Sequence, residues 1–174
     1  MLRLFKPDHY IENFQQFNLE RLKEKGIKLL ICDIDNTLVA HDEPYPTKEV
    51  VSFVKKVRSM NIEFVLISNN TIERSEKFAK HLEVDFYGFA KKPLKTTYKK
   101  ILNDYNVSVH ELASLGDQLL TDVLGSRRMK IDTTLAKPLY ASDNGYTKIN
   151  RRIENLIYRL LARRNYLIRG VYDE

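Results

Sequence analysis

The chain has 174 residues, of which 43% are hydrophobic and 30% charged, and its 29 basic and 23 acidic side chains give a formal net charge of +6. This composition is typical of a globular protein with one domain, and it excludes the collagen-like, disordered and disulfide-rich classes of protein. No apolar run approaches the ~18 residues that a membrane span requires, and residues 1–8 meet an acid and a proline before a secretory leader could form its apolar core.

The first segment in chain order, residues 1–26, predicts one or two short helices. The second of these begins at Asn18, a residue type that caps helices, and closes at Gly26, where a left-handed residue ends a helix. The aromatic and aliphatic side chains of this segment either pack against the rest of the fold or lie at a membrane surface.

From residue 27 onward, short apolar runs alternate with amphipathic segments of helical length. Five strands are predicted, over residues 27–32, 62–67, 84–89, 112–115 and 131–135. Such alternation is typical of a parallel sheet with helices on both faces. We therefore predict an α/β fold, a Rossmann-like three-layer sandwich around a mainly parallel five-stranded sheet.

Four helices are predicted between these strands, over residues 47–60, 71–82, 94–105 and 118–128. Thr47 is the expected N-cap of the first helix, and Asn70 or Thr71 that of the second. The second helix should turn four apolar side chains toward the sheet: Ile72, Phe78, Ala79 and Leu82.

Residues 148–168 predict a last helix, which is amphipathic and basic. Its apolar side chains recur at helical spacing with arginines opposite: Ile149, Ile153, Leu156, Ile157, Leu160 and Leu161. Such a surface is either a solvated helix face or a site for anionic partners, namely phospholipid headgroups, RNA or phosphorylated metabolites. We expect a single domain over residues 1–174, with 1–26 as a helical extension and 148–168 as a C-terminal helix.

Polar side chains follow four of the predicted strands, at the edge of the sheet where α/β folds bind ligands. In chain order they are Asp33 and Asp35, Ser68 to Asn70, Lys91 to Pro93, and Gly116 to Asp122. Taken singly, Ser68, Lys92 or Asp122 is more often a cap, a surface charge or a turn former than a catalyst. Brought to one edge in this order, the carboxylate, hydroxyl and ammonium groups predict an active site.

Asp33 and Asp35 form the most informative pair, because two carboxylates at the end of a buried strand repel each other. A metal ion, a shared proton or both must offset this repulsion. The chain has no histidine or cysteine cluster that would select a soft metal. We therefore expect Mg²⁺, a hard cation that oxygen ligands bind.

This ordered set of residues resembles the four motifs of the haloacid dehalogenase superfamily. Those motifs are Asp-x-Asp-x-Thr/Val, a Ser or Thr at the end of the second strand, a Lys, and an acidic pair such as Gly-Asp-x-x-x-x-Asp. The resemblance implies that Asp33 is the nucleophile that attacks phosphorus and that Asp35 is the acid–base residue. It also implies that Ser68 and Lys92 hold the phosphoryl oxygens and that Asn69 contributes to substrate binding.

The same resemblance implies a metal site. Asp33, Asp117 and the main-chain carbonyl of Asp35 would bind Mg²⁺, and Asp122 would complete this acidic set by supporting the metal shell or Lys92.

The intervals between the motifs leave no room for a cap domain over the site. Only 32 residues separate Asp35 from Ser68 and only 23 separate Ser68 from Lys92, and each interval already has to form a helix and a strand. Capless members of this superfamily tend to act on macromolecular or membrane-borne substrates, because a small metabolite would leave the site open to water. Residues 41–46 form either a small flap over the site or a tight loop.

Longer runs resemble the subclass IIIA phosphatases of the YqeG-like group, which is related to phosphatidylglycerophosphate phosphatases. They are Asp33 to Val39, Ser68 to Asn70, Lys91 to Pro93, Gly116 to Gly125 and Thr147 to Glu154. The resemblance implies a Mg²⁺-dependent phosphomonoester hydrolase that works through an aspartyl-phosphate and acts on phosphatidylglycerophosphate in phospholipid synthesis.

Two alternatives remain open at this point. The same chemistry could serve a phosphoprotein, a nucleotide or a sugar phosphate, or the chain could be a non-catalytic module that contacts RNA or the ribosome through its basic helix. Nucleic acid is not required for the chemistry. The single cysteine, Cys32, should be a buried and inert side chain, and its isolation favours a reducing, cytoplasmic location. A lipid substrate would add peripheral contact with the inner face of an anionic membrane.

Overall fold

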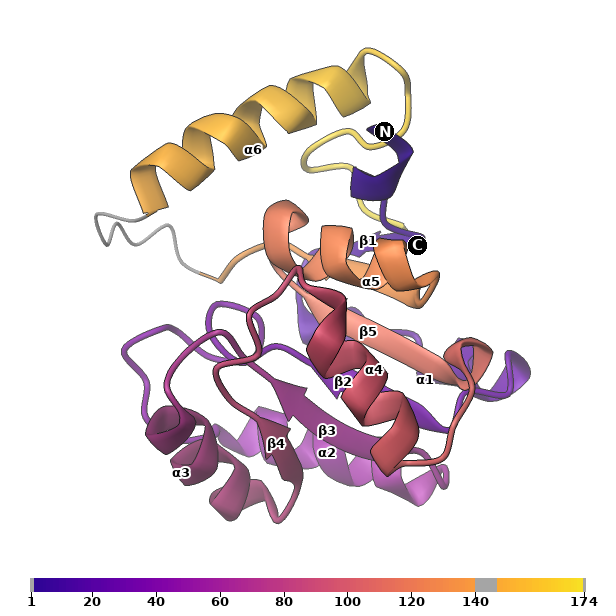
Figure 1. Cartoon of the computed structure of the whole chain (residues 1–174), viewed down its shortest axis with the longest axis vertical. Helices are drawn as coiled ribbons and strands as arrows, with labels where there is room; N and C mark the ends of the chain where they lie inside the picture. The colour runs from indigo at the N-terminus through magenta and orange to yellow at the C-terminus, as the bar shows by residue number, and fades with distance from the viewer. Residues whose placement is uncertain (1, 140–146, 174) are drawn as a thin grey trace.

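A parallel sheet of six strands runs through the computed structural model, which describes residues 2–139 and 147–173 (Figure 1). The strands lie in the order β1–β6–β5–β2–β3–β4, and every neighbouring pair is parallel. Their bounds are β1 His9–Ile11, β2 Leu29–Cys32, β3 Glu63–Ile67, β4 Asp85–Tyr87, β5 Leu112–Gly116 and β6 Asp132–Ala136. The predicted α/β fold with a parallel sheet is confirmed.

Helices cover both faces of this sheet. The α-helices are α1 Leu19–Glu24, α2 Lys48–Ser59, α3 Ile72–Leu82, α4 Lys95–Asp104, α5 Leu124–Met129 and α6 Thr147–Ala162. Shorter turns are η1 Leu2–Phe5, η2 Phe14–Gln16, η3 Val109–Glu111 and the π-helical η4 Leu119–Val123. Among the described residues, no helix combines the length and hydropathy that crossing a membrane requires.

Alternate residues of the central strands enter two separate cores. Leu30 and Cys32 of β2 face one core with α1, α2 and α3, whereas Leu29 and Ile31 face the other with α4. This is the pattern of a strand that is buried on both faces. Cys32 is fully buried and burial raises the pKa of its thiol, in keeping with an inert side chain.

Side-chain caps define where the predicted helices begin. Asn18 Oδ1 accepts a hydrogen bond from Arg21 N at 3.0 Å, and Thr71 Oγ1 accepts one from Arg74 N at 3.2 Å. Thr47 caps α2 in the same way, and Gly26 closes the segment after α1 with φ +67°. Of the two candidates for the α3 cap, the structure selects Thr71.

The sheet has six strands, so the predicted number of five is wrong. The additional strand is β1, within the segment that was expected to be helical, and it pairs with β6 at the edge of the sheet. Three residues between two 3₁₀ turns are too few to show the alternation that identifies a strand. Pairing with β6, a contact distant in sequence, makes this segment a strand.

Three helix predictions also differ from the structure. Ile72 is 59% exposed, because it lies at the first position of α3 beyond the end of the sheet. The helix predicted over 118–128 begins with η4, in which Asp122 N and Val123 N both donate to Gln118 O, and becomes α-helical only at α5.

The last predicted helix ends at Ala162 rather than at residue 168. Asn165, three residues after this end, adopts a left-handed conformation with φ 52°. The side chains of residues 147–151, including the predicted Ile149, lie outside the described part of the chain.

The strand order places the switch point of the sheet between β2 and β5. From β2 the chain runs outward through β3 and β4, and it then returns to β5 on the other side of β2. Crevices at such points are the usual ligand sites of open α/β sheets. The segments that follow β2 and β5 carry Asp33 and Asp117.

We expect Ile11→Ala to lower the free energy of unfolding by about 2–4 kcal/mol, because Ile11 of β1 is buried in the core and truncation leaves a cavity. Urea unfolding followed by circular dichroism measures this effect. The neighbouring Glu12→Ala is the matched control, since Glu12 is exposed. Equal stability of the two variants would show that β1 does not belong to the core.

Candidate active site at the ends of the strands

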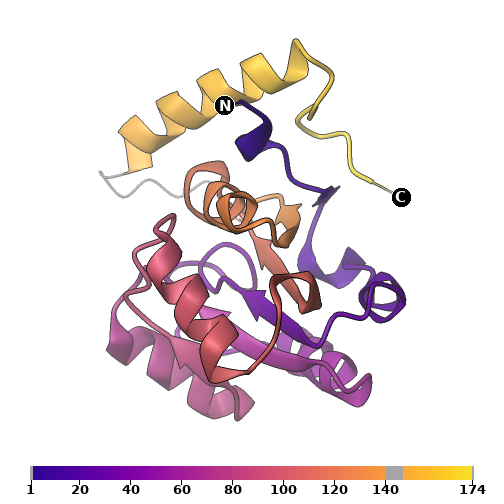
Figure 2. The ribbon, with the colours of Figure 1, turned by 45° about the vertical axis from the view of Figure 1, so that its right-hand side comes forward.

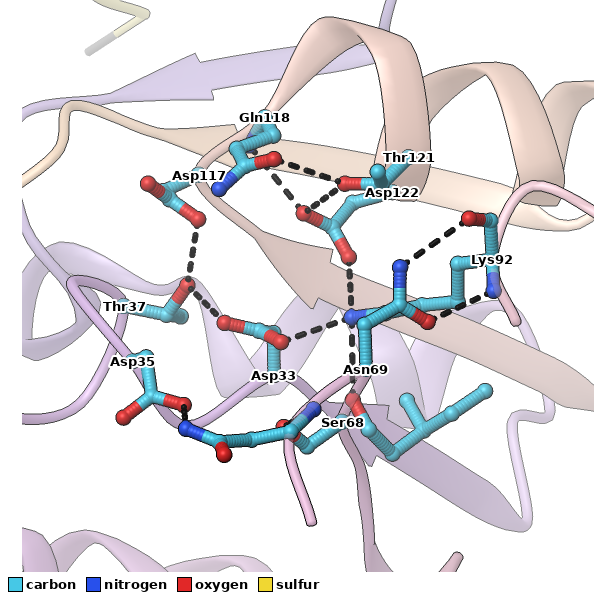
Figure 3. A network of polar contacts seen from close by, with 12 residues as sticks. Asp33, Asp35, Thr37, Ser68, Asn69, Lys92, Asp117, Gln118, Thr121 and Asp122 are labelled. Carbon is cyan, nitrogen blue, oxygen red and sulfur yellow. Dashed lines mark hydrogen bonds and ion pairs between the residues drawn. The ribbon is translucent and has the colours of Figure 1, made fainter. Parts of the chain in front are cut away.

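Lys92 lies at the centre of the site, buried between two carboxylates (Figure 3). Its Nζ donates to Asp33 Oδ1 and to Asp122 Oδ1, each at 2.6 Å, and to the carbonyl oxygen of Ile67 at 3.0 Å. All three N–H donors of the ammonium are therefore used. Asp33 follows β2, Ile67 ends β3 and Asp122 lies beyond β5, so this one side chain joins the ends of three strands.

The turn after β2 brings Thr37 back toward Asp33. Asn36 adopts φ 63°, and its N–H donates to the carbonyl oxygen of Val39 at 2.7 Å. Thr37 Oγ1 consequently lies 3.2 Å from Asp33 Oδ2 and 3.4 Å from Asp117 Oδ1. A hydroxyl carries one proton and can donate to only one of these carboxylates at a time. Within the described residues, Asp117 forms no ion pair.

Burial is the largest cause of the raised pKa values of Asp33 and Asp117. Burial raises the pKa of Asp33 from its usual 3.8 to about 7, even though the Lys92 ammonium opposes the shift. Burial and the charges of Asp33 and Asp122 raise the pKa of Asp117 well above its usual value. Burial by itself would lower the pKa of Lys92, but the carboxylates of Asp122 and Asp33 outweigh it and raise that pKa. Lys92 is therefore a permanent cation.

The acidic group fits a divalent cation. One carboxylate oxygen from each of Asp33, Asp117 and Asp122 lies within 4.8 Å of the other two, and all three residues are buried. Ionisation of all three carboxylates against one ammonium would leave the site two charges short of balance, which is costly away from water. Carboxylate oxygens are hard ligands, so Mg²⁺ suits this set. Asp117 is the least engaged of the three, since Asp122 also accepts from Gln118 N at 3.1 Å and from Thr121 Oγ1 at 3.2 Å.

Asp35 is held separately, by a pair of side chains from the α3 end of the site. Its Oδ1 accepts from Arg74 Nη2 at 2.8 Å and from Arg74 Nε at 3.1 Å, and its Oδ2 accepts from Asn70 Nδ2 at 3.1 Å. Sequence reasoning did not find Arg74. The available signal was a basic side chain in the first turn of a helix, where the helix dipole disfavours positive charge unless a carboxylate pairs with it.

Asn69 fixes the loop that carries Lys92. Its Oδ1 accepts from Lys92 N at 2.6 Å and its Nδ2 donates to Lys92 O at 3.0 Å, so both ends of the amide are used (Figure 3). Ser68 is buried beside it, and its Oγ accepts from Asn70 N at 3.0 Å. The hydroxyl proton of Ser68 has no acceptor among the described residues and is free to donate to a ligand. The substrate contact expected of Asn69 stays a prediction.

Three comparisons with known proteins bear on this site. A model of the haloacid dehalogenase-like hydrolases matches residues 6–129, which include every side chain described above. The chain is also 32% identical over 165 residues to the Probable phosphatase YqeG of Bacillus subtilis (strain 168), which covers 95% of this chain and 96% of that protein.

Solved structures share the fold at lower identity. The cobalt-bound deoxy-D-mannose-octulosonate 8-phosphate phosphatase of Haemophilus influenzae superposes with a TM-score of 0.55 at 16% identity and covers 80% of this chain and 92% of its own. An uncharacterized protein of Listeria monocytogenes serotype 4b gives a TM-score of 0.54 at 14% identity, over 76% of this chain and 99% of its own. These two likenesses concern the fold alone.

Gly116 has no Cβ at the place where Asp122 packs, and a Cβ there would lie 2.4 Å from Asp122 Cγ. We expect Gly116→Ala to displace Asp122, to lower the free energy of unfolding by about 1–3 kcal/mol, and to reduce kcat/KM for an aryl phosphate by ~10². Ser114→Ala, also on β5, adds no atom and serves as the control. A Gly116→Ala variant with normal turnover would show that the position of Asp122 is unimportant.

The raised pKa values of Asp33 and Asp117 make the metal-free chain sensitive to pH. Both carboxyls hold a proton more tightly in the folded chain than in the unfolded chain, so the stability that they contribute is present below about pH 4 and is lost as the pH rises toward about 7. In a metal chelator, we expect the free energy of unfolding of Asp117→Asn to exceed that of the unaltered chain increasingly over this interval. Urea titrations at several pH values measure the difference. If the two free energies of unfolding differed by the same amount at every pH, the pKa of Asp117 would not be raised in the folded chain.

Proposed function

The chain belongs to the haloacid dehalogenase-like hydrolases and is a phosphatase, and we propose that it hydrolyses a phospholipid, phosphatidylglycerophosphate, through a phosphorylated Asp33 with Mg²⁺ as cofactor. The observation that carries the chemistry is the buried ammonium of Lys92 between Asp33 and Asp122. The carboxylate of Asp33 therefore lies beside a fixed positive charge. Ser68, whose Oγ accepts from Asn70 N, has its hydroxyl proton free to donate.

In the proposed first step, an Asp33 oxygen attacks phosphorus and the bond from phosphorus to the lipid oxygen breaks. Lys92 and Ser68 donate to the phosphoryl oxygens, for which Lys92 exchanges its bond to Asp33 for one to the substrate. Donors that are fixed before the reaction stabilise the developing charge without reorganisation. The covalent intermediate divides one difficult displacement into two.

Asp35 is the proposed acid–base residue. It donates a proton to the leaving oxygen and then takes one from the water that attacks the phosphorylated Asp33, which releases phosphate and restores the carboxylate. Arg74 and Asn70 fix both oxygens of Asp35, so Arg74 is a positioning residue.

Asp33, Asp117 and the main-chain carbonyl of Asp35 are the proposed Mg²⁺ ligands, with Asp122 supporting them through Lys92. When bound, the cation would supply positive charge that offsets the repulsion between the Asp33 carboxylate and the phosphate.

The surroundings of the site support an amphiphilic substrate. The intervals from Asp35 to Ser68 and from Ser68 to Lys92 contain only a loop, one helix and one strand each, so neither interval forms a cap domain. Large apolar side chains are instead exposed on segments that follow β3, β4 and β6: Ile72, Phe89, Leu94 and Leu139. A charged centre within an exposed apolar rim matches a phosphate headgroup on acyl chains.

Removal of the nucleophile tests the chemistry. We expect Asp33→Asn to show no turnover above background with an aryl phosphate and no phosphorylated chain by mass spectrometry, and Asp35→Asn to lose ~10²–10⁴ in kcat. Assays with and without Mg²⁺ complete the test, and Asp104→Asn, a change on the exposed end of α4, is the control. Wild-type turnover by Asp33→Asn would exclude the covalent mechanism.

A comparison of two related substrates tests the lipid. We expect kcat/KM for phosphatidylglycerophosphate in detergent micelles to exceed that for glycerol 3-phosphate by more than about tenfold, because the second compound has the phosphomonoester without the acyl chains. Equal turnover of the two, or better turnover of a nucleotide, a sugar phosphate or a phosphopeptide, would replace the lipid by that class of substrate.

A further inference from the structure

Helix α6 presents an apolar surface that nothing in the described chain covers. Ile157 and Leu161 are buried against η4 and β6, and they attach the helix to the fold. Ile153, Leu156 and Leu160 are instead 44%, 55% and 37% exposed. Their spacing places them along one side of the helix, next to the buried side. Figures 1 and 2 show α6 along the outside of the molecule, with its outward side open in both views.

The charges that border this stripe are all positive. Arg152, Arg159 and Arg163 are exposed and lie three or four residues from Leu156 or Leu160, so they line the outer edge of the stripe. Glu154, the one acidic side chain among residues 152–172, is turned the other way and accepts from Leu120 N at 3.3 Å. The outward side of α6 therefore combines exposed apolar area with unbalanced positive charge.

We propose that this surface, formed by Ile153, Leu156, Leu160 and the three arginines, docks the chain onto an anionic phospholipid bilayer. An amphipathic helix that lies in the interface uses both features, since its apolar side chains enter the acyl boundary and its basic side chains meet anionic headgroups. A second copy of the chain would bring the arginines of both helices together. A nucleic acid would pair with the arginines but would leave the three apolar side chains in water.

The inner side of α6, opposite the docking surface, is attached next to the active site. The Glu154 bond to Leu120 joins α6 to η4, the segment that also contains Asp122, and burial together with the carboxylate of Asp122 raises the pKa of Glu154. A bilayer bound to α6 would thus keep the chain, and with it the acidic group, at a lipid surface. This consequence rests on the proposed function, whereas docking itself does not depend on catalysis.

Vesicle sedimentation of the full chain tests the docking. With vesicles of equal parts phosphatidylglycerol and phosphatidylcholine, we expect binding that weakens as the salt concentration rises, and much weaker binding to phosphatidylcholine alone. Asp33→Asn should bind as well as the unaltered chain, which separates docking from hydrolysis. Lipid turnover without vesicle binding would overturn the docking surface and leave the phosphatase intact, and vesicle binding without lipid turnover would support docking and contradict the substrate.

Two paired variants locate the surface. We expect Arg159→Gln with Arg163→Gln to weaken binding to the mixed vesicles about tenfold or more, and Leu156→Ser with Leu160→Ser to weaken it to a similar extent. The matched control is Lys55→Gln with Lys56→Gln, which removes the same charge from exposed positions of α2, at the opposite end of the molecule from α6 in both ribbon views.

Unchanged thermal unfolding and unchanged hydrolysis of an aryl phosphate should accompany the loss of binding in both α6 variants. Equal weakening by the α2 control would show that net charge alone drives the binding and would overturn the assignment to α6. Two other results would also overturn the docking of α6 onto a bilayer. If the chain forms a dimer that Leu156→Ser with Leu160→Ser abolishes, the partner is a second copy of the chain. If the chain binds RNA and not vesicles, the partner is RNA.

Discussion

The ion-paired ammonium of Lys92 is the interaction on which the rest of the site depends. An ammonium removed from water is tolerated only when opposite charges and hydrogen-bond acceptors replace the lost solvation. Here Asp33, Asp122 and the carbonyl oxygen of Ile67 replace it. These three groups follow or end three different strands, so Lys92 can be satisfied only when β2, β3 and β5 are assembled in register. The same contact therefore links the integrity of the sheet to the position of the nucleophile.

Neutral groups then hold the charged ones in place, which explains several residues that have no charge of their own. Asn69 binds the main chain of Lys92 on both sides, and Gly116 leaves the space that Asp122 occupies. Thr37 bridges Asp33 and Asp117. Replacement of any of these residues would displace a charge relative to its partners. In a buried site, such a shift changes electrostatic energies far more than it would in water.

Most of this arrangement can be predicted from the sequence, because the patterns that indicate it involve residues close together in the chain. Helix caps such as Thr47 act within a few residues. Asp33 and Ser68 come directly after strands whose apolar runs are clear, and Lys92 follows β4 after a short loop. The features that were missed depend on contacts distant in sequence. Strand β1 forms because β6 lies beside it. Arg74 pairs with Asp35, which lies 39 residues earlier in the chain but within hydrogen-bond distance. Glu154 attaches α6 to the fold through the hydrogen bond that it accepts from Leu120 in η4.

The acidic group of the site and the basic side chains of α6, which could attract an anionic partner, lie in different parts of the molecule. The net charge of the chain is +6, yet the acidic group of the site has three carboxylates around one ammonium and would repel an anionic substrate without a cation. The outward side of α6 carries exposed arginines, which can attract an anionic surface. A free phosphate compound would gain little from charges outside the pocket, because salt screens them over about 8–10 Å. A bilayer could lie along α6 and would gain both from the charges of its arginines and from its exposed apolar side chains. The separation of charge therefore favours a substrate that is itself part of a surface.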